Sequence, residues 1–120
     1  MPATAANQNS SATNINPMGT DGFEFVEYAS SDPKQLEELF TKLGFIKIAK
    51  HKSKNVHLWR QGDINFILNA EHDSQASGHF NVHGPSANAM AFRVRDAAYA
   101  IKRAKELGAK VVEVPKGEGE

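Results

Sequence analysis

The chain has 120 residues, with 14 basic and 14 acidic side chains and no cysteine. A net charge of zero argues against binding to nucleic acid or to an anionic membrane, because both need an excess of basic side chains. The lack of cysteine in this sequence excludes disulfides, thiolate zinc sites and cysteine nucleophiles.

The N-terminal segment is polar and offers little to a hydrophobic core. Residues 1–17 consist mainly of Ala, Asn, Ser and Thr, a composition that predicts a disordered tail. The segment lacks the basic and apolar regions of a signal peptide. No stretch of the sequence approaches the roughly 20 apolar residues that span a bilayer. We therefore expect a cytoplasmic protein.

The next part is predicted to contain a strand, a helix and three more strands. Residues 23–29 are rich in aromatic and β-branched side chains, which favours a strand. Apolar residues at helical spacing predict a helix over residues 36–43, with N-cap candidates at 30–33 and Gly44 at its C-terminal end. The further strands are expected at residues 45–50, 56–60 and 64–69, with a hairpin turn at 61–63.

The second half is predicted to repeat part of this order. Residues 70–86 carry Gly, Pro, Ser and His side chains and are interpreted as a long loop. A fifth strand is expected at residues 90–95, and Asp96 is a candidate N-cap for a helix over 97–107. The valines of residues 111–114 predict a sixth strand.

The two halves align at a constant offset. Asp32 and Asp96 are 64 positions apart, and so are the Leu-Gly pairs that end in Gly44 and Gly108. This offset exceeds the roughly 20–50 residues of solenoid repeats and indicates a duplicated supersecondary module. We expect an α+β fold in a domain of residues 18–115, with a complete module at about 22–70, a partial module at about 88–115, and a polar tail at 116–120.

Three stretches resemble a known family. They are NPMGTDGFEFVEYAS (16–30), HKSKNVHLWRQGDINFILN (51–69) and HGPSANAMAFRVRDAAYAIKRAKELGA (83–109). Together with the tandem βαβββ order, they resemble the vicinal oxygen chelate superfamily and, within it, the N-terminal domain of bacterial 4-hydroxyphenylpyruvate dioxygenases. The resemblance covers about residues 16–115.

The resemblance implies a parent enzyme of tyrosine catabolism. Dioxygenases of this family convert 4-hydroxyphenylpyruvate and O2 to homogentisate and CO2, with non-haem Fe(II) held by two His and one Glu. In that family the iron and the substrate pocket lie in a C-terminal domain. The resemblance therefore implies a fragment that is inactive alone, with that C-terminal domain as its partner and a homo-oligomer as its assembly.

The resemblance also implies where related modules carry metal ligands. Those positions are occupied here by Phe25 in the first strand, Ile67 in the fourth strand and Ala89 in the second copy. None of these side chains can coordinate a metal. We therefore expect no catalytic, cofactor-binding or metal-binding residue in this chain.

The histidines are the remaining candidates for chemistry. His79 and His83 are four residues apart and could share a metal on a helix, but the neighbouring glycines and proline favour a loop. His72 lies near them in that loop. His51 and His57 flank a basic turn that could attract an anion, although such turns are usually solvated. No role is assigned to any of the five.

Two further side chains stand out on predicted strands. Glu27 lies inside an apolar strand, where a lone carboxylate could act as a general base. Pairing is the commoner outcome, with Arg93, Arg95 or a backbone donor as partner. Trp59 is expected to pack in the core or at an interface.

Three alternatives stay open from the sequence. The chain could be a fragment of 4-hydroxymandelate synthase, which resembles the dioxygenase in fold, cofactor and substrate. It could be a non-enzymatic module whose apolar cup binds a hydrophobic ligand. It could also be a structural domain that mediates assembly.

Overall fold

The computed structural model describes residues 15–72 and 74–112. The chain divides into a central compact unit, residues 23–91, and a second unit made from the segments on either side of it. The two units are described separately below.

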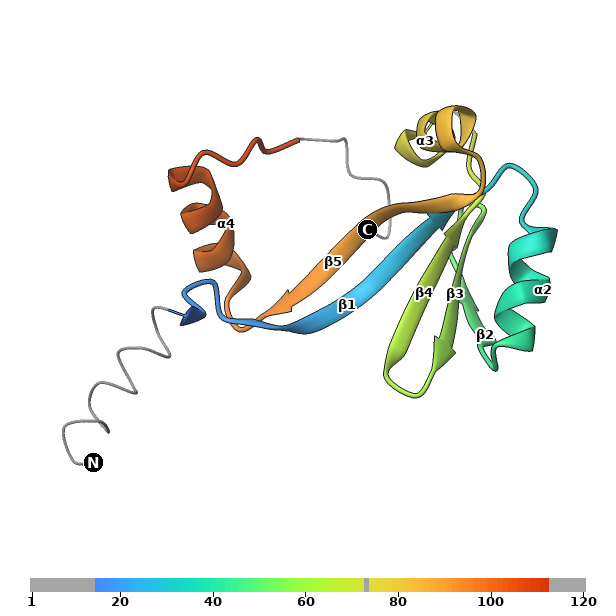
Figure 1. Ribbon diagram of the computed structural model, residues 1–120, viewed down its shortest axis with the longest axis horizontal. Coiled ribbons are helices and arrows are strands. Elements are labelled where there is room, and N and C mark those ends of the chain that lie inside the picture. Colours follow the sequence, from blue (N-terminus) through green and yellow to red (C-terminus); the bar gives the residue numbers. More distant parts are fainter. Residues whose placement is uncertain (1–14, 73, 113–120) are drawn as a thin grey trace. The chain divides into compact units, whose positions relative to one another are not determined.

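The central unit contains the predicted βαβββ module. Its elements in chain order are β1 (Thr20–Ala29), α2 (Lys34–Lys42), β2 (Ile46–Lys50), β3 (Val56–Gln61) and β4 (Ile64–Asn69). The sheet has the order β2-β3-β4-β1-β5, in which β5 spans Ser86–Val94. β1 runs parallel to β4, whereas β3 is antiparallel to both β2 and β4 (Figure 1).

An aromatic core joins α2 to one face of the sheet. Leu36 and Phe40, the buried residues of α2, form a cluster with Phe45, Trp59 and Leu68. The ring centroid of Phe40 lies 5.7 Å from that of Trp59, in an edge-to-face arrangement. Such aromatic pairs add to the stabilisation that burial of apolar area provides. Trp59 is therefore a core residue, as predicted.

The predicted hairpin turn and the predicted C-terminal ends of two helices are confirmed. Gln61 pairs with Ile64 across a two-residue hairpin loop, and Gly62 within it has a φ of +57°. Gly44 and Gly108 follow α2 and the later helix with φ values of +95° and +93°. Only glycine adopts this region without strain. The two glycines that are 64 positions apart in the sequence therefore have nearly the same backbone conformation.

The flanking unit contains α4 (Ala97–Glu106). Asp96 caps this helix as predicted, because its Oδ1 accepts a hydrogen bond of 3.1 Å from the backbone N–H of Tyr99. None of the helix residues is buried, and Tyr99 and Ile101 are 48% and 51% exposed. The apolar side of α4 is thus uncovered within the described part of the chain.

The predicted long loop at residues 70–86 is wrong, because α3 (Gln75–His83) occupies most of it. Ser74 and Ser77 form a reciprocal capping box, with hydrogen bonds of 3.1 Å and 2.9 Å between each hydroxyl and the other residue's N–H. The apolar residues of α3 do not gather on one side, so periodicity gives no signal for it. Gly84, with a φ of +75°, ends the helix.

The second half departs from prediction in two further places. β5 begins at Ser86, four residues before the predicted start at position 90. Val111 and Val112 belong to no strand, and Val114 lies outside the described residues. The predicted sixth strand is therefore not found at the two valines that the structure describes.

Candidate functional site

The sheet face opposite α2 carries two adjoining hollows. Phe66 and Leu68 of β4 pack toward α2, so Ile67 between them points to the other face. There Ile67, Leu58 and Phe25 line a hollow of about 150 Å³. A second hollow, of about 230 Å³, shares Leu58 and Ile67 and is lined further by Ala49, Lys50, His51, Val56 and His57.

Two of the three positions implied for lost metal ligands thus come together. Phe25 and Ile67 line the same hollow and present only carbon atoms from their side chains. Ala89 lies on β5 and is not among the lining residues. Within residues 15–72 and 74–112, no three His, Asp or Glu side chains are grouped so that they could hold a metal.

The polar rim of the smaller hollow is tied into the sheet. Arg60 donates from Nε to Oδ1 of Asn65 at 2.7 Å, and Asn65 donates from Nδ2 to the carbonyl oxygen of Glu24 at 3.1 Å. These bonds hold both side chains in place at the mouth of the hollow. The arrangement is suited to apolar contact and offers no nucleophile beside a base.

Glu27 is paired with side-chain amides, which were not among its expected partners. Its Oε2 accepts a hydrogen bond of 2.7 Å from Nδ2 of Asn88. Asn69 approaches Oε1 at 3.5 Å, the limit of a hydrogen bond. Asn88 also donates to Oε1 of Gln75 at 2.9 Å, so one amide joins β1, β5 and the first turn of α3. Nothing in the local sequence pointed to Asn88, because the expected partners were Arg93, Arg95 or a backbone donor.

The basic turn between β2 and β3 is closed by one of its own histidines. Nδ1 of His51 accepts hydrogen bonds from the backbone N–H groups of Ser53 and Lys54, both at 3.2 Å. These bonds satisfy that nitrogen inside the turn. His51 therefore has a structural role at the start of this turn, where its ring holds the backbone in place.

His57 lies close to the contact between the sheet and α2. Burial lowers the pKa of His57 from its ordinary value of 6.5, and the nearby positive charges of Lys47 and Lys50 lower it further. The carboxylate of Glu37, whose Oε2 is 3.0 Å from Nζ of Lys47, acts in the opposite direction on this pKa. The net effect favours the neutral imidazole in the folded chain.

This lowered pKa predicts a pH dependence of stability. As the pH falls below 6.5, the unfolded chain binds a proton at His57 before the folded chain does, so the free energy of unfolding decreases until the lowered folded pKa is passed. We expect the free energy of unfolding of His57→Gln to fall less steeply with decreasing pH than that of the original chain. Urea unfolding between pH 7 and pH 5 measures it, and an identical slope in both proteins would contradict the assignment.

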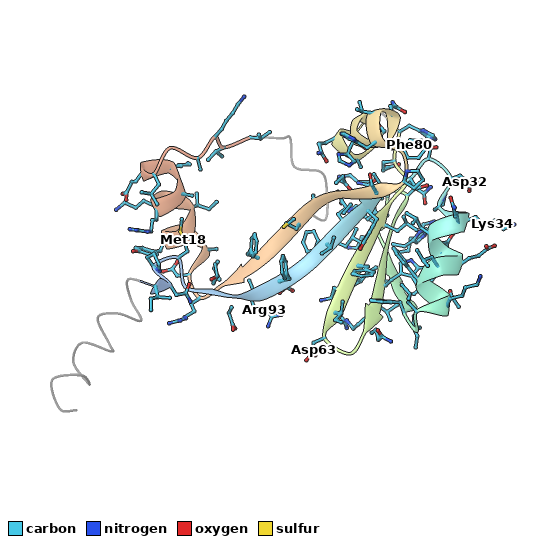
Figure 2. The ribbon with its side chains drawn as sticks, viewed as in Figure 1. Met18, Asp32, Lys34, Asp63, Phe80 and Arg93 are labelled. Carbon is cyan, nitrogen blue, oxygen red and sulfur yellow. The ribbon has the colours of Figure 1, made fainter. Side chains whose placement is uncertain are left out.

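The other three histidines lie on or beside α3. The rings of His79 and His83 are 4.6 Å apart between centroids, and Nε2 of His79 is 3.0 Å from Oγ of Ser86. His72 lines a separate hollow of about 130 Å³ with Phe80, which lies on α3 (Figure 2). The loop that was expected to keep His79 and His83 from sharing one helix face is replaced by α3.

A family described as "Hydroxyphenylpyruvate dioxygenase, HPPD, N-terminal" matches residues 14–120 of the sequence. The chain belongs to this family. With the βαβββ order and the parallel β1–β4 pair, this membership confirms the predicted α+β fold of the vicinal oxygen chelate type.

Relatives of known name support the family assignment. The chain is 55% identical over 102 residues to a 4-hydroxyphenylpyruvate dioxygenase of Pseudomonas sp. (strain P.J. 874), covering 85% of this chain and 29% of the relative. It is 58% identical over 98 residues to "Hemolysin VllY" of Vibrio vulnificus, covering 79% of this chain and 28% of that protein. The chain therefore spans less than a third of the length of these relatives.

A solved structure agrees with this HPPD-type assignment. A "xylose isomerase-like TIM barrel/4-hydroxyphenylpyruvate dioxygenase fusion protein" matches with a TM-score of 0.71 and 45% identity, over 74% of this chain and 15% of the fusion protein. In the part of the chain that the structure describes, no helix is both long and apolar enough to cross a membrane.

Proposed function

We propose that this chain is the non-catalytic N-terminal part of a 4-hydroxyphenylpyruvate dioxygenase. The observation that carries the proposal is the family match over residues 14–120, together with relatives that are named for this activity. The proposed parent is a cytoplasmic homo-oligomer that acts in tyrosine catabolism.

In the proposed reaction, the parent enzyme takes 4-hydroxyphenylpyruvate and O2 to homogentisate and CO2. Fe(II) would supply the oxygen chemistry in the parent. The residues at the implied ligand positions of this chain, Phe25, Ile67 and Ala89, do not fit that metal, so no step of the reaction is placed here.

The proposed work of this chain is to support the catalytic domain. The cluster beneath α2 packs this helix onto the sheet. The hollow on the opposite face is lined by Phe25, Leu58 and Ile67 and by the polar residues Glu24, Arg60 and Asn65. A module built in this way adds a packed scaffold. The C-terminal domain of the parent is the proposed partner.

One observation favours a second candidate. The 45% identity to the fusion protein makes this kind of domain compatible with a parent that carries an additional TIM barrel. In that case the same module would serve as a scaffold in a two-activity protein. The two candidates differ in the parent protein, and both assign no catalytic step to this chain.

A chimaeric enzyme tests the proposal. The matched 102 residues of the Pseudomonas sp. relative are replaced by the corresponding residues of this chain, and homogentisate is measured. We expect the chimaera to form homogentisate, and we expect the relative without its N-terminal region to form none. A folded, iron-loaded chimaera that makes no homogentisate would contradict the proposal.

A further inference from the structure

α3 places two imidazole rings one helical turn apart. His79 and His83 are i and i+4 on this helix, so their side chains share one face. Their ring centroids are 4.6 Å apart and the rings are tilted by 40°. His79 is half-buried and His83 is exposed, so the pair is open to a solute from one side.

Ser86 contacts one ring nitrogen of His79. Its Oγ lies 3.0 Å from Nε2 of His79 and 2.9 Å from the carbonyl oxygen of Gly84. A neutral imidazole has one N–H group and one nitrogen lone pair. In the tautomer in which Ser86 donates to Gly84 and accepts from Nε2–H, Nδ1 of His79 keeps the lone pair.

This is the state that a metal-binding histidine needs. Such a histidine usually donates its second ring N–H to an oxygen atom, which fixes the tautomer and the ring orientation. Here Ser86 and Gly84 supply that support from the residues that follow the helix. In that tautomer His79 combines a supported N–H group with a lone pair that a cation can use.

We propose that His79 and His83 form a two-histidine site on α3 for a divalent transition-metal cation of the Cu²⁺, Ni²⁺ or Zn²⁺ class. Bonds from such a cation to imidazole nitrogens are about 2.0–2.1 Å long, and the two ring centroids lie 4.6 Å apart. The remaining coordination positions are open to water. Fe²⁺ stands below these cations in affinity for nitrogen ligands, so the site is distinct from the iron centre proposed for the parent.

Metal binding at this site would also stabilise α3. Gly78 lies in the middle of the helix with no side chain near it, and an interior glycine costs a helix about 1 kcal/mol relative to alanine. A cation that links positions 79 and 83 ties together the two ends of the last helical turn, which follows Gly78. Slower amide exchange in α3 is therefore the expected structural response.

Titration of the purified chain with Cu²⁺ alone tests the proposal. We expect one equivalent to bind with an electron paramagnetic resonance spectrum that shows two nitrogen ligands, and the amides of α3 to exchange more slowly. His79→Ala and His83→Ala are each expected to weaken binding by roughly tenfold or more. His72→Ala, which alters a neighbouring histidine outside α3, is expected to leave binding unchanged.

A matched double variant tests whether the spacing of the two histidines matters, and not only their number. Asn81→His combined with His83→Asn keeps the same residues but moves one ring to the opposite side of the helix. We expect this variant to lose the two-nitrogen spectrum. The proposal is overturned if the double variant or either alanine variant binds Cu²⁺ as the original chain does, or if the original chain shows no two-nitrogen signal.

Discussion

Replacing Phe40 with alanine is expected to lower the free energy of unfolding by about 3–5 kcal/mol, because it empties the centre of the α2 core. Phe40 is 1% exposed, and its ring lies 5.3 Å from that of Tyr28 and 5.2 Å from that of Phe66. Urea unfolding followed by the fluorescence of Trp59, the single tryptophan of the chain, measures the loss.

A neighbouring residue of the same helix provides the control. Leu39 is also apolar but is 47% exposed, so Leu39→Ala should cost about 1 kcal/mol or less. Equal losses for the two variants would show that the core does not lie where the cluster around Phe40 places it.

The backbone amides of α2 are expected to exchange with solvent more slowly than those of α4, by a factor on the order of 100 or more. Amides of α2 should be the slower ones, because the helix buries Leu36 and Phe40 against the sheet. α4 has no buried residue, so it opens without first disrupting a core.

Mass spectrometry with residue-level fragmentation resolves the two helices within one experiment. The comparison needs no variant, because α2 and α4 occupy equivalent places in the 64-residue repeat. Comparable exchange rates in the two helices would contradict the view that the central module is the stable part of the chain.

The sequence was sufficient for those elements in which local signals agree. Residues 64–69 combine β-branched and aromatic side chains with a glycine turn before them, and they form β4. The helix that Asp96 begins and Gly108 follows was predicted from its cap and its terminator, and both are confirmed. At these places propensity, period and turn chemistry point to the same structure.

The sequence failed where the decisive contact is not periodic. α3 depends on a serine–serine capping box at Ser74 and Ser77, in a segment whose Gly78 and scattered apolar residues are typical of a loop. The partner of Glu27 depends on the pairing of distant strands, which brings Asn88 to it across 61 positions. A capping search that accepts serine at the third helical position would have found α3, whereas no local signal reveals Asn88.

Homogentisate formation by the chain alone is the measurement that tests the silent-scaffold account most directly. The purified chain is supplied with Fe(II), O2 and 4-hydroxyphenylpyruvate, and its product is compared with that of Fe(II) alone. The account predicts no homogentisate above the Fe(II) control, because Phe25, Ile67 and Ala89 stand at the implied ligand positions and cannot coordinate a metal. Turnover above that control would contradict it and would place catalytic chemistry inside these 120 residues.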